Sequence, residues 1–210
     1  MRKMSTYEEK KALLVLHNLL NFNLEDWETA DRPDLQNKTA SWGIEVVRDL
    51  YPKEIESEKH IKSVWNLPYS KWPKKKLKIL SKNKVKLNIA NDALQSASLG
   101  ETTNTPDHVI DTIKEKIDLL NKRQYYSLDR YDLYVEVDTT CIDINHKSHV
   151  AKIIEEIVEY QNQNDLKYKM LYLVHHYVLC ACDLDSGTFS HIAISRKLQE
   201  GILKSINTLN

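Results

Sequence analysis

Two carboxylates on a short predicted β-hairpin constrain this chain more than any other feature. Leu35–Gln36 begins one strand, residues 37–41 form a polar turn, and the β-branched run Ile44–Val47 is typical of the return strand. The hairpin would place Asp34 and Glu45 close together on adjacent strands, where they repel each other unless a positive charge lies between them. Paired oxygen ligands of this kind are typical of a site for a hard divalent cation.

The residues around the two acids carry a resemblance to a known family. Pro33-Asp34 and Glu45-Val46-Val47 resemble the core motif of the PD-(D/E)XK nuclease superfamily, and in particular uncharacterised bacterial and phage members with a similar hairpin. The resemblance implies that Asp34, Glu45 and the main-chain carbonyl of Val46 bind Mg²⁺ or Mn²⁺. In that family a lysine two residues after the glutamate positions or activates the attacking water. Val47 occupies that place here, so this chain departs from the pattern at the catalytic lysine.

The segment 7–22 predicts an amphipathic helix, with leucines, Ala12 and Val15 at helical spacing. A glutamate on the first helix often completes the metal shell in the superfamily, and Glu9 is the candidate here, with Glu8 next to it. The alternative is that Glu9 is a surface acid that favours the positive end of the helix dipole.

A second helix is predicted from Pro106 or Asp107 to about Lys122. Its apolar stripe is flanked by Lys116, which the resemblance makes the candidate for a relocated catalytic cation, with Lys114 as a reserve. The alternative is that the aliphatic stem of Lys116 covers the edge of the apolar face.

Residues 52–105 predict an insertion rich in lysine and aromatic residues. Lysines interleaved with aromatic rings can hold a phosphate backbone and stack on bases. The candidate nucleic-acid-binding residues are Lys71, Trp72, Lys74, Lys75 and Lys76. The alternative is a solvated lysine face with no ligand. Two prolines predict that residues 65–90 are not regular helix, and residues 92–105 have the composition of a loop.

Overall charge does not identify a partner, because 30 basic residues balance 30 acidic ones. No apolar run is long enough to span a bilayer, so no membrane association is expected. Cys141, Cys180 and Cys182 have no spacing typical of a disulfide framework, which indicates reduced thiols and a cytoplasmic location.

The later elements complete an α/β pattern. A strand is predicted at 132–138, a helix at 147–160, strands at 169–175 and 177–184, and a last helix at about 191–207. The order predicts one domain over residues 1–210 with a central mixed β-sheet flanked by helices. It is the order expected of a restriction-endonuclease-like core, in which the metal-binding hairpin lies inside the sheet and the next helix covers it.

The function implied by the resemblance is metal-dependent hydrolysis of phosphodiester bonds in DNA, and the residues leave RNA open as a substrate. Homodimers are common among the similar proteins, so a homodimer is a further expectation. The second hypothesis is a catalytically degenerate nuclease fold that binds nucleic acid or a protein partner, for example in phage or host defence, and Val47 favours it. A third is a structural domain in which Asp34 caps a turn and Glu45 pairs with a lysine.

Overall fold

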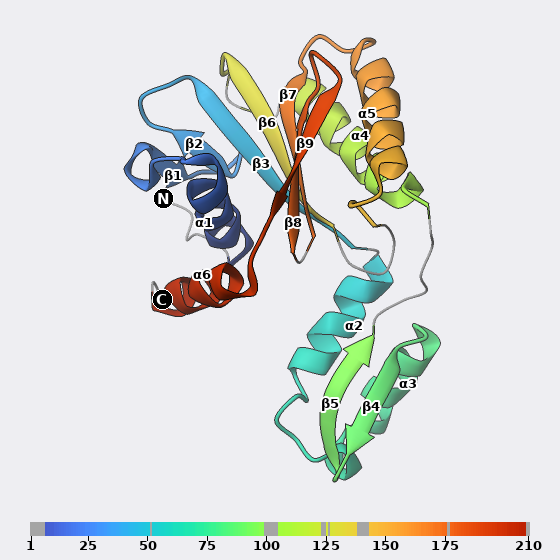
Figure 1. Cartoon of the computed structure of the whole chain (residues 1–210). Coiled ribbons are helices and arrows are strands. Elements are labelled where there is room, and N and C mark those ends of the chain that lie inside the picture. Colours follow the sequence, from blue (N-terminus) through green and yellow to red (C-terminus); the bar gives the residue numbers. More distant parts are fainter. Residues whose placement is uncertain are drawn as a thin grey trace. The chain divides into compact units, whose positions relative to one another are not determined.

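The computed structural model describes residues 7–50, 52–98, 105–122, 125, 127–137, 143–175 and 177–208. The chain divides into two compact units, which we call the sheet unit and the lysine-rich unit (Figure 1). The sheet unit comprises Met1–Asp49, Thr105–Thr139 and Asp143–Asn210. The lysine-rich unit comprises Leu50–Asn104 and Thr140–Ile142, and it covers the segment in which we expected an insertion.

A mixed seven-stranded sheet forms the centre of the sheet unit, with the strand order β1-β2-β3-β6-β7-β8-β9. The strands are β1 (Trp27–Thr29), β2 (Leu35–Asn37), β3 (Trp42–Asp49), β6 (Arg130–Val137), β7 (Tyr168–His175), β8 (Val178–Asp183) and β9 (Thr188–Ala193). The predicted hairpin is confirmed, because β2 and β3 are antiparallel with Leu35 opposite Ile44. Strands β3, β6 and β7 are parallel neighbours, while β8 and β9 add antiparallel edges. The prediction of an α/β fold with a central mixed sheet flanked by helices is therefore confirmed.

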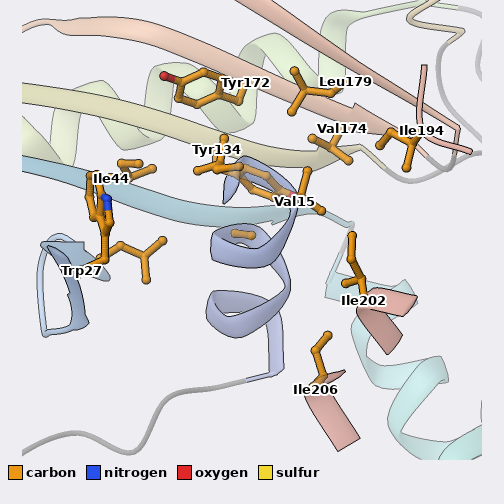
Figure 2. Close-up of a cluster of buried hydrophobic side chains, with 13 residues drawn as sticks. Val15, Trp27, Ile44, Tyr134, Tyr172, Val174, Leu179, Ile194, Ile202 and Ile206 are labelled. Carbon is orange, nitrogen blue, oxygen red and sulfur yellow. The ribbon is translucent and has the colours of Figure 1, made fainter. Parts of the chain in front are cut away.

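Helices cover both faces of this sheet. They are α1 (Tyr7–Leu20), α4 (Asp107–Asn121), α5 (Lys147–Gln161) and α6 (Arg196–Thr208). Alternate residues of a strand point to opposite faces, and Ile44 of β3 packs with Val15 of α1 and Ile202 of α6 in one core cluster (Figure 2). Glu45, the next residue of β3, contacts α4 instead. Within the described residues, none of the helices is long and apolar enough to cross a bilayer.

The lysine-rich unit has a small core of its own. It contains α2 (Pro52–Lys62), α3 (Lys74–Lys82) and an antiparallel pair formed by β4 (Lys86–Ala90) and β5 (Ala93–Ser98). Trp72, Leu80 and Leu94 are buried together in this core. The prediction that residues 65–90 are not regular helix holds for residues 65–73 and for β4, but it was wrong for α3. Pro73 immediately precedes that helix, where its missing N–H breaks no helical hydrogen bond. The predicted loop at 92–105 was also wrong in part, since it includes β5, and residues 99–104 lie outside the described residues.

Two further elements differ from the predictions. Strand β1 lies in an acidic stretch where the sequence analysis predicts no strand, and its Trp27 is buried and stacks on Phe22. Pairing with β2 supplies the backbone hydrogen bonds of this short strand. The last helix begins at Arg196 rather than near His191, because residues 188–193 pair with β8 as the edge strand β9.

Candidate functional site

Asp34 is held against β3 by the residue before it. Pro33 is buried and packs on Gly43 of β3 so closely that a Cβ atom there would overlap the proline Cγ. Asp34 follows directly, and its Oδ2 accepts a hydrogen bond from the Val46 amide at 3.0 Å. The lack of a side chain at Gly43 therefore lets Pro33 approach and places the Asp34 carboxylate beside the middle of β3.

Glu45 lies in the middle of β3 and is only 5% exposed. Its Oε1 accepts a hydrogen bond from Lys116 Nζ of α4 at 2.8 Å, which forms a partly buried ion pair. The other oxygen, Oε2, is buried and accepts no hydrogen bond of good geometry from the described residues. The structure therefore brings together Asp34, Glu45 and Lys116, three of the four side chains predicted for the catalytic centre.

The charge on Glu45 is costly in this environment. Burial raises the pKa of its carboxyl above the ordinary value, and repulsion from Asp34 raises it further. Lys116 and the Tyr125 hydroxyl oppose that rise by favouring the carboxylate. The effect of Asp34 shows that the two acids are close enough to influence one another, as the hairpin predicted.

Two tyrosines complete the surroundings of Glu45, and the sequence analysis missed both. Burial and the neighbouring Glu45 hold the pKa of Tyr125 well above its ordinary range, so its hydroxyl remains a proton donor. The pKa of Tyr168, the first residue of β7, is raised mainly by burial. Tyr168 donates a hydrogen bond to the Lys116 carbonyl at 3.4 Å and so fixes the turn of α4 that carries the lysine. Tyrosine is so common in buried strands that neither position stands out in the sequence.

A second set of polar contacts joins β3 to α4. Asp49 is 1% exposed, and its Oδ1 accepts a hydrogen bond from the Thr112 hydroxyl at 2.9 Å. His108 also forms an ion pair with Asp49 if it is protonated. His108, Thr112 and Lys116 are four residues apart, so they share one face of α4 and run along β3. This face fixes the rotation of α4 about its axis and thus the direction of the Lys116 side chain.

The prediction that Glu9 completes the metal shell is not supported by its position. Glu9 is 3% exposed and lies on α1, whose core residues contact the Ile44 face of the sheet. Glu45 points to the opposite face, toward α4, so the sheet separates the two glutamates. Val46 remains next to the site through its amide, and a metal-binding role for its carbonyl stays a prediction.

The predicted nucleic-acid-binding residues all lie in the lysine-rich unit. Lys71, Lys74 and Lys75 are exposed, whereas Lys76 is half-buried and donates to the Ser63 hydroxyl. Trp72 is 4% exposed, and its indole Nε1 donates to the Leu67 carbonyl at 3.1 Å. The predicted stacking of Trp72 on bases is therefore corrected to a structural role, because its ring belongs to the core of the unit.

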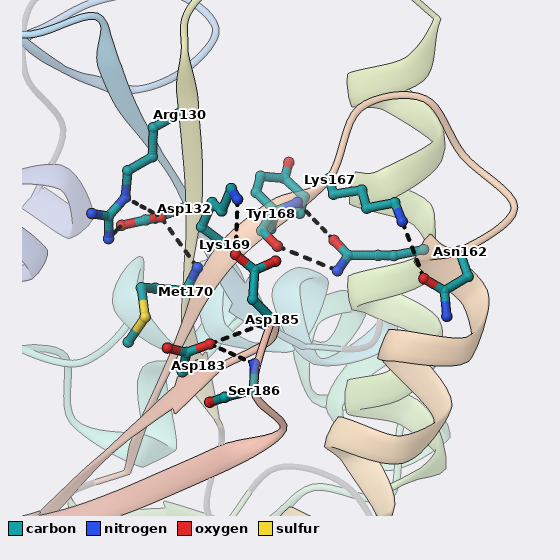
Figure 3. Close-up of polar contacts among 11 residues, drawn as sticks. Arg130, Asp132, Asn162, Lys167, Tyr168, Lys169, Met170, Asp183, Asp185 and Ser186 are labelled. Atoms are coloured by element: carbon teal, nitrogen blue, oxygen red, sulfur yellow. Dashed lines mark hydrogen bonds and ion pairs between the residues drawn. The ribbon is translucent and has the colours of Figure 1, made fainter.

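A buried charge network on the other face of the sheet has a structural role. Asp132 of β6 is fully buried and accepts two hydrogen bonds from Arg130, at 3.0 and 2.8 Å (Figure 3). The Met170 amide and the Trp42 indole also donate to it. These donors compensate the burial that raises the pKa of Asp132. The network links β3, β6 and β7 on the face opposite to Glu45.

The donor set near Glu45 suits a cation that takes few protein ligands. Within the described part of the chain, no three acidic, histidine or cysteine side chains are grouped as metal ligands. Mg²⁺ commonly uses one or two carboxylates and takes its remaining ligands from water and substrate phosphates. Asp34 and Glu45 supply two carboxylates, and the buried Glu45 Oε2 is an oxygen without a well-oriented donor among the described residues. These residues therefore fit Mg²⁺ or Mn²⁺ and do not fit a fully protein-ligated metal such as structural zinc.

Comparisons of the chain with protein-family models, with curated proteins and with solved structures gave no match.

Proposed function

We propose that this protein is a metal-dependent phosphodiester hydrolase of the PD-(D/E)XK type that acts on DNA. The ion pair between Lys116 and Glu45 carries the proposal. It brings the ammonium group of Lys116 from α4 to the face of β3 on which the family's catalytic lysine would lie. In this chain, the position of that lysine in the sequence is occupied by Val47. A lysine that stands 71 residues away in the sequence would thus replace one that is missing from the strand.

The arrangement of elements supports the same proposal. The β2–β3 hairpin lies inside the mixed sheet, and α4 packs over β3. This agrees with the helix–sheet–helix core that the resemblance implies, with the acidic hairpin in the sheet and the next long helix of the sheet unit above it. The fold and the site therefore support a restriction-endonuclease-like assignment on separate grounds.

Each residue of the site would have a distinct role. A bound Mg²⁺ or Mn²⁺ would polarise the scissile phosphate and lower the pKa of a nearby water. Asp34 and Glu45 would supply the carboxylate oxygens, with the Val46 carbonyl as a predicted third donor. Lys116 would stabilise the negative charge that develops on the phosphate. Tyr125, whose raised pKa keeps it protonated, would remain a hydrogen-bond donor beside Glu45.

The lysine-rich unit would provide general affinity for the phosphate backbone. Between Lys59 and Asn91 the sequence contains no acidic residue, and Lys74, Lys75 and Lys78 of α3 are exposed. Leu80, on the apolar side of α3, is buried in the core of the unit, and Leu77 packs against that core. Exposed lysines on a segment that contains no acidic residue favour contact with phosphates, and such contacts read no base sequence.

A cleavage assay tests the catalytic proposal. Plasmid DNA, linear DNA and RNA would be incubated with Mn²⁺ or Mg²⁺ and the wild type, Asp34→Ala, Glu45→Ala, Lys116→Ala or Lys114→Ala. Lys114 is the matched control, because it lies on the same helix but pairs with Glu156. We expect wild type and Lys114→Ala to cut, and the other three variants to lose about 100-fold or more in rate. Circular dichroism would confirm that each variant is folded.

A second candidate function is a degenerate nuclease fold that binds nucleic acid or a protein partner. The observation that favours it is the direct contact between Lys116 and Glu45, which a purely structural ion pair would also make. Calorimetry with Mn²⁺ separates the two functions. A wild type that neither cuts nucleic acid nor binds Mn²⁺ would exclude the enzyme, and DNA binding by that same protein would favour the module.

Salt dependence tests the role of the lysine-rich unit. Replacing Lys74, Lys75 and Lys78 with alanine should reduce DNA affinity and lower the slope of log K against log salt by about 0.9 for each phosphate that the variant no longer neutralises. The control replaces Lys197 and Lys204, which are exposed lysines on α6 of the sheet unit. Equal effects of the two sets would show that the lysine-rich unit has no special role in binding.

A further inference from the structure

Strand β9 forms one edge of the seven-stranded sheet, and no strand pairs with its outer side within the described part of the chain. The Ile194 amide donates to the Tyr177 carbonyl at 2.7 Å, which continues the register between β8 and β9. Main-chain groups of alternate residues point to the same edge of a strand, so those of Phe189, His191 and Ala193 point away from β8. These three residues therefore offer a row of main-chain donors and acceptors to a further strand.

The sequence of β9 does not protect this edge in the ways that natural sheets use. Exposed edges are usually protected by lysine, by proline, by a bulge or by a very short strand. Strand β9 spans six residues, contains neither lysine nor proline, and pairs with β8 without a shift in register. The opposite edge is protected, because β1 has only three residues and carries Glu28. Strand β9 is therefore the edge that can accept a further strand.

A groove lies beside this edge. Helix α5 runs alongside β9 (Figure 1), and a groove of about 420 Å³ lies between the two elements. Both elements supply its apolar lining, which consists of Ala151, Ile154, Val158 and Phe189. Side chains of an added strand would alternate between the two faces of the sheet, so every second side chain would enter the groove. The groove can therefore select the side chains of a strand that the main chain of β9 binds.

The groove is acidic on its α5 side. Glu155 and Glu159 line it, both are exposed, and neither forms an ion pair with another described residue. They are four residues apart on α5, which is a separation of about 6 Å along the helix axis. Alternate side chains on one face of a strand are about 6.6 Å apart. Two basic side chains on the groove face of an added strand would therefore match the two carboxylates in spacing and in charge.

A second copy of this chain fits the edge poorly because of the same charges. Antiparallel pairing of two β9 strands about a two-fold axis would place both α5 helices on the same face of the joined sheet. Glu155 and Glu159 of each copy would then approach the same two acids of the other copy, and like charges repel. The anionic backbone of a nucleic acid would be repelled as well. The charges therefore favour a basic protein segment.

We propose that β9 binds an extended segment of a partner protein as an additional strand, and that this segment carries lysine or arginine at alternate positions. Its main chain would pair with the outward-pointing groups of β9, as in other cases of strand addition. The aliphatic stems of its basic side chains would cover Ile154 and Val158, and their charged ends would reach Glu155 and Glu159. Strands β6, β7 and β8 separate β9 from β3, so this surface is separate from the candidate catalytic site.

Amide hydrogen exchange measured by NMR in the presence of a synthetic peptide tests this proposal. The probe is a peptide of alternating lysine and valine that is as long as β9, and the matched control has glutamate in place of lysine. We expect the lysine peptide to slow exchange of the outward-pointing amides, those of Phe189, His191 and Ala193, by roughly tenfold or more at saturation. The amides of Ser190 and Ile192 face β8 and should change far less. The glutamate peptide should bind at least about tenfold more weakly.

Variants and a methylated peptide distinguish strand addition from general attraction between opposite charges. The double variant Glu155→Gln, Glu159→Gln should weaken binding of the lysine peptide by roughly three- to tenfold. Glu115→Gln is the control, because Glu115 is an exposed acid on α4, and it should leave binding unchanged. N-methylation of the lysine peptide at the amides that face β9 keeps its charge but removes its main-chain donors, so it should abolish the protection. Circular dichroism would confirm that each variant is folded.

The pattern of protection decides the outcome. Absent protection, protection spread evenly over β9, equal binding of the two peptides, or equal effects of the variants at α5 and α4 would each overturn the proposal. Protection of the same three amides that rises with protein concentration in the absence of peptide would also overturn it, because a second copy would then occupy the edge.

Discussion

The ring of Pro33 lies so close to Gly43 that a Cβ atom on the glycine would overlap the proline Cγ. The same Cβ would also lie 2.7 Å from Leu128 Cδ1, so both sides of the position are closed. Because Asp34 follows Pro33 directly, the packing at Gly43 determines where one carboxylate of the site stands.

Gly43→Ala should therefore lower the free energy of unfolding by about 1–3 kcal/mol, as overpacking does elsewhere. It should also weaken Mn²⁺ binding, because the displaced Pro33 moves Asp34. Thermal unfolding and calorimetry measure the two effects. Gly201→Ala is the control, since its Cβ would meet nothing within 4 Å on α6 and alanine favours a helix. Unchanged stability of Gly43→Ala would contradict this account.

Removal of Lys116 should destabilise the protein even if it has no catalytic role. Lys116→Ala leaves the Glu45 carboxylate buried without its ion pair, which should cost about 1–3 kcal/mol in chemical denaturation. Lys114→Ala breaks the more exposed pair with Glu156 and should cost only about 0.2–1 kcal/mol. Equal losses in the free energy of unfolding for the two variants would show that the Glu45–Lys116 pair contributes no more to stability than a surface pair.

The raised pKa of Glu45 gives a defined pH dependence. The stability that protonated Glu45 contributes is fully present below pH 4.5, the ordinary pKa of a glutamate. It is lost as the pH rises through the raised pKa of the folded state. Mn²⁺ binding requires the carboxylate, so affinity should instead fall as the pH is lowered through that same pKa.

Side-chain carboxyl NMR can follow the titration of Glu45 directly. Asp34→Asn should lower the pKa of Glu45, because it removes a repelling charge, and Lys116→Met should raise it, because it removes an attracting one. Shifts in the opposite directions would mean that the three side chains do not interact as the structure indicates.

Two tryptophans of the lysine-rich unit should respond differently to truncation. Trp72→Ala removes a buried ring that donates a hydrogen bond, and should cost about 3–5 kcal/mol of stability. Trp65 is 48% exposed, so Trp65→Ala should have little effect on stability and should lower affinity for single-stranded DNA. Fluorescence during denaturation separates the two. A stable Trp72→Ala variant would restore Trp72 as a candidate for base stacking.

The sequence alone predicted the parts of the fold whose periodicity is clear. The apolar stripe of α4, with Ile113 and Ile117, and the β-branched run in β3 identified both elements that carry the site. The lysine-rich unit was harder, because its small core leaves few apolar residues in each element. Trp72 and Leu80 are buried by tertiary contacts that no local pattern reveals.

The candidate site was predictable only in part, for a related reason. Asp34 and Glu45 are linked by a hairpin, so local sequence was enough to place them near each other. Lys116 could be proposed only through resemblance, since its contact with Glu45 depends on how α4 packs on the sheet. Tyr125 approaches from a loop and Tyr168 from a later strand, and neither has a sequence signal that distinguishes it from an ordinary core tyrosine.

The division of the sheet unit into separate segments also affects how the protein is made. Glu45 precedes Lys116 by 71 residues, and Leu50–Asn104 of the other unit lie between the two. At a synthesis rate of roughly 5–20 residues per second, the hairpin leaves the ribosome about 4–14 s before its lysine. During that interval Glu45 has no α4 to cover or neutralise it, while the lysine-rich unit can already build its core. The nascent chain should therefore fold its inserted unit first and complete the acidic site only after α4 has emerged.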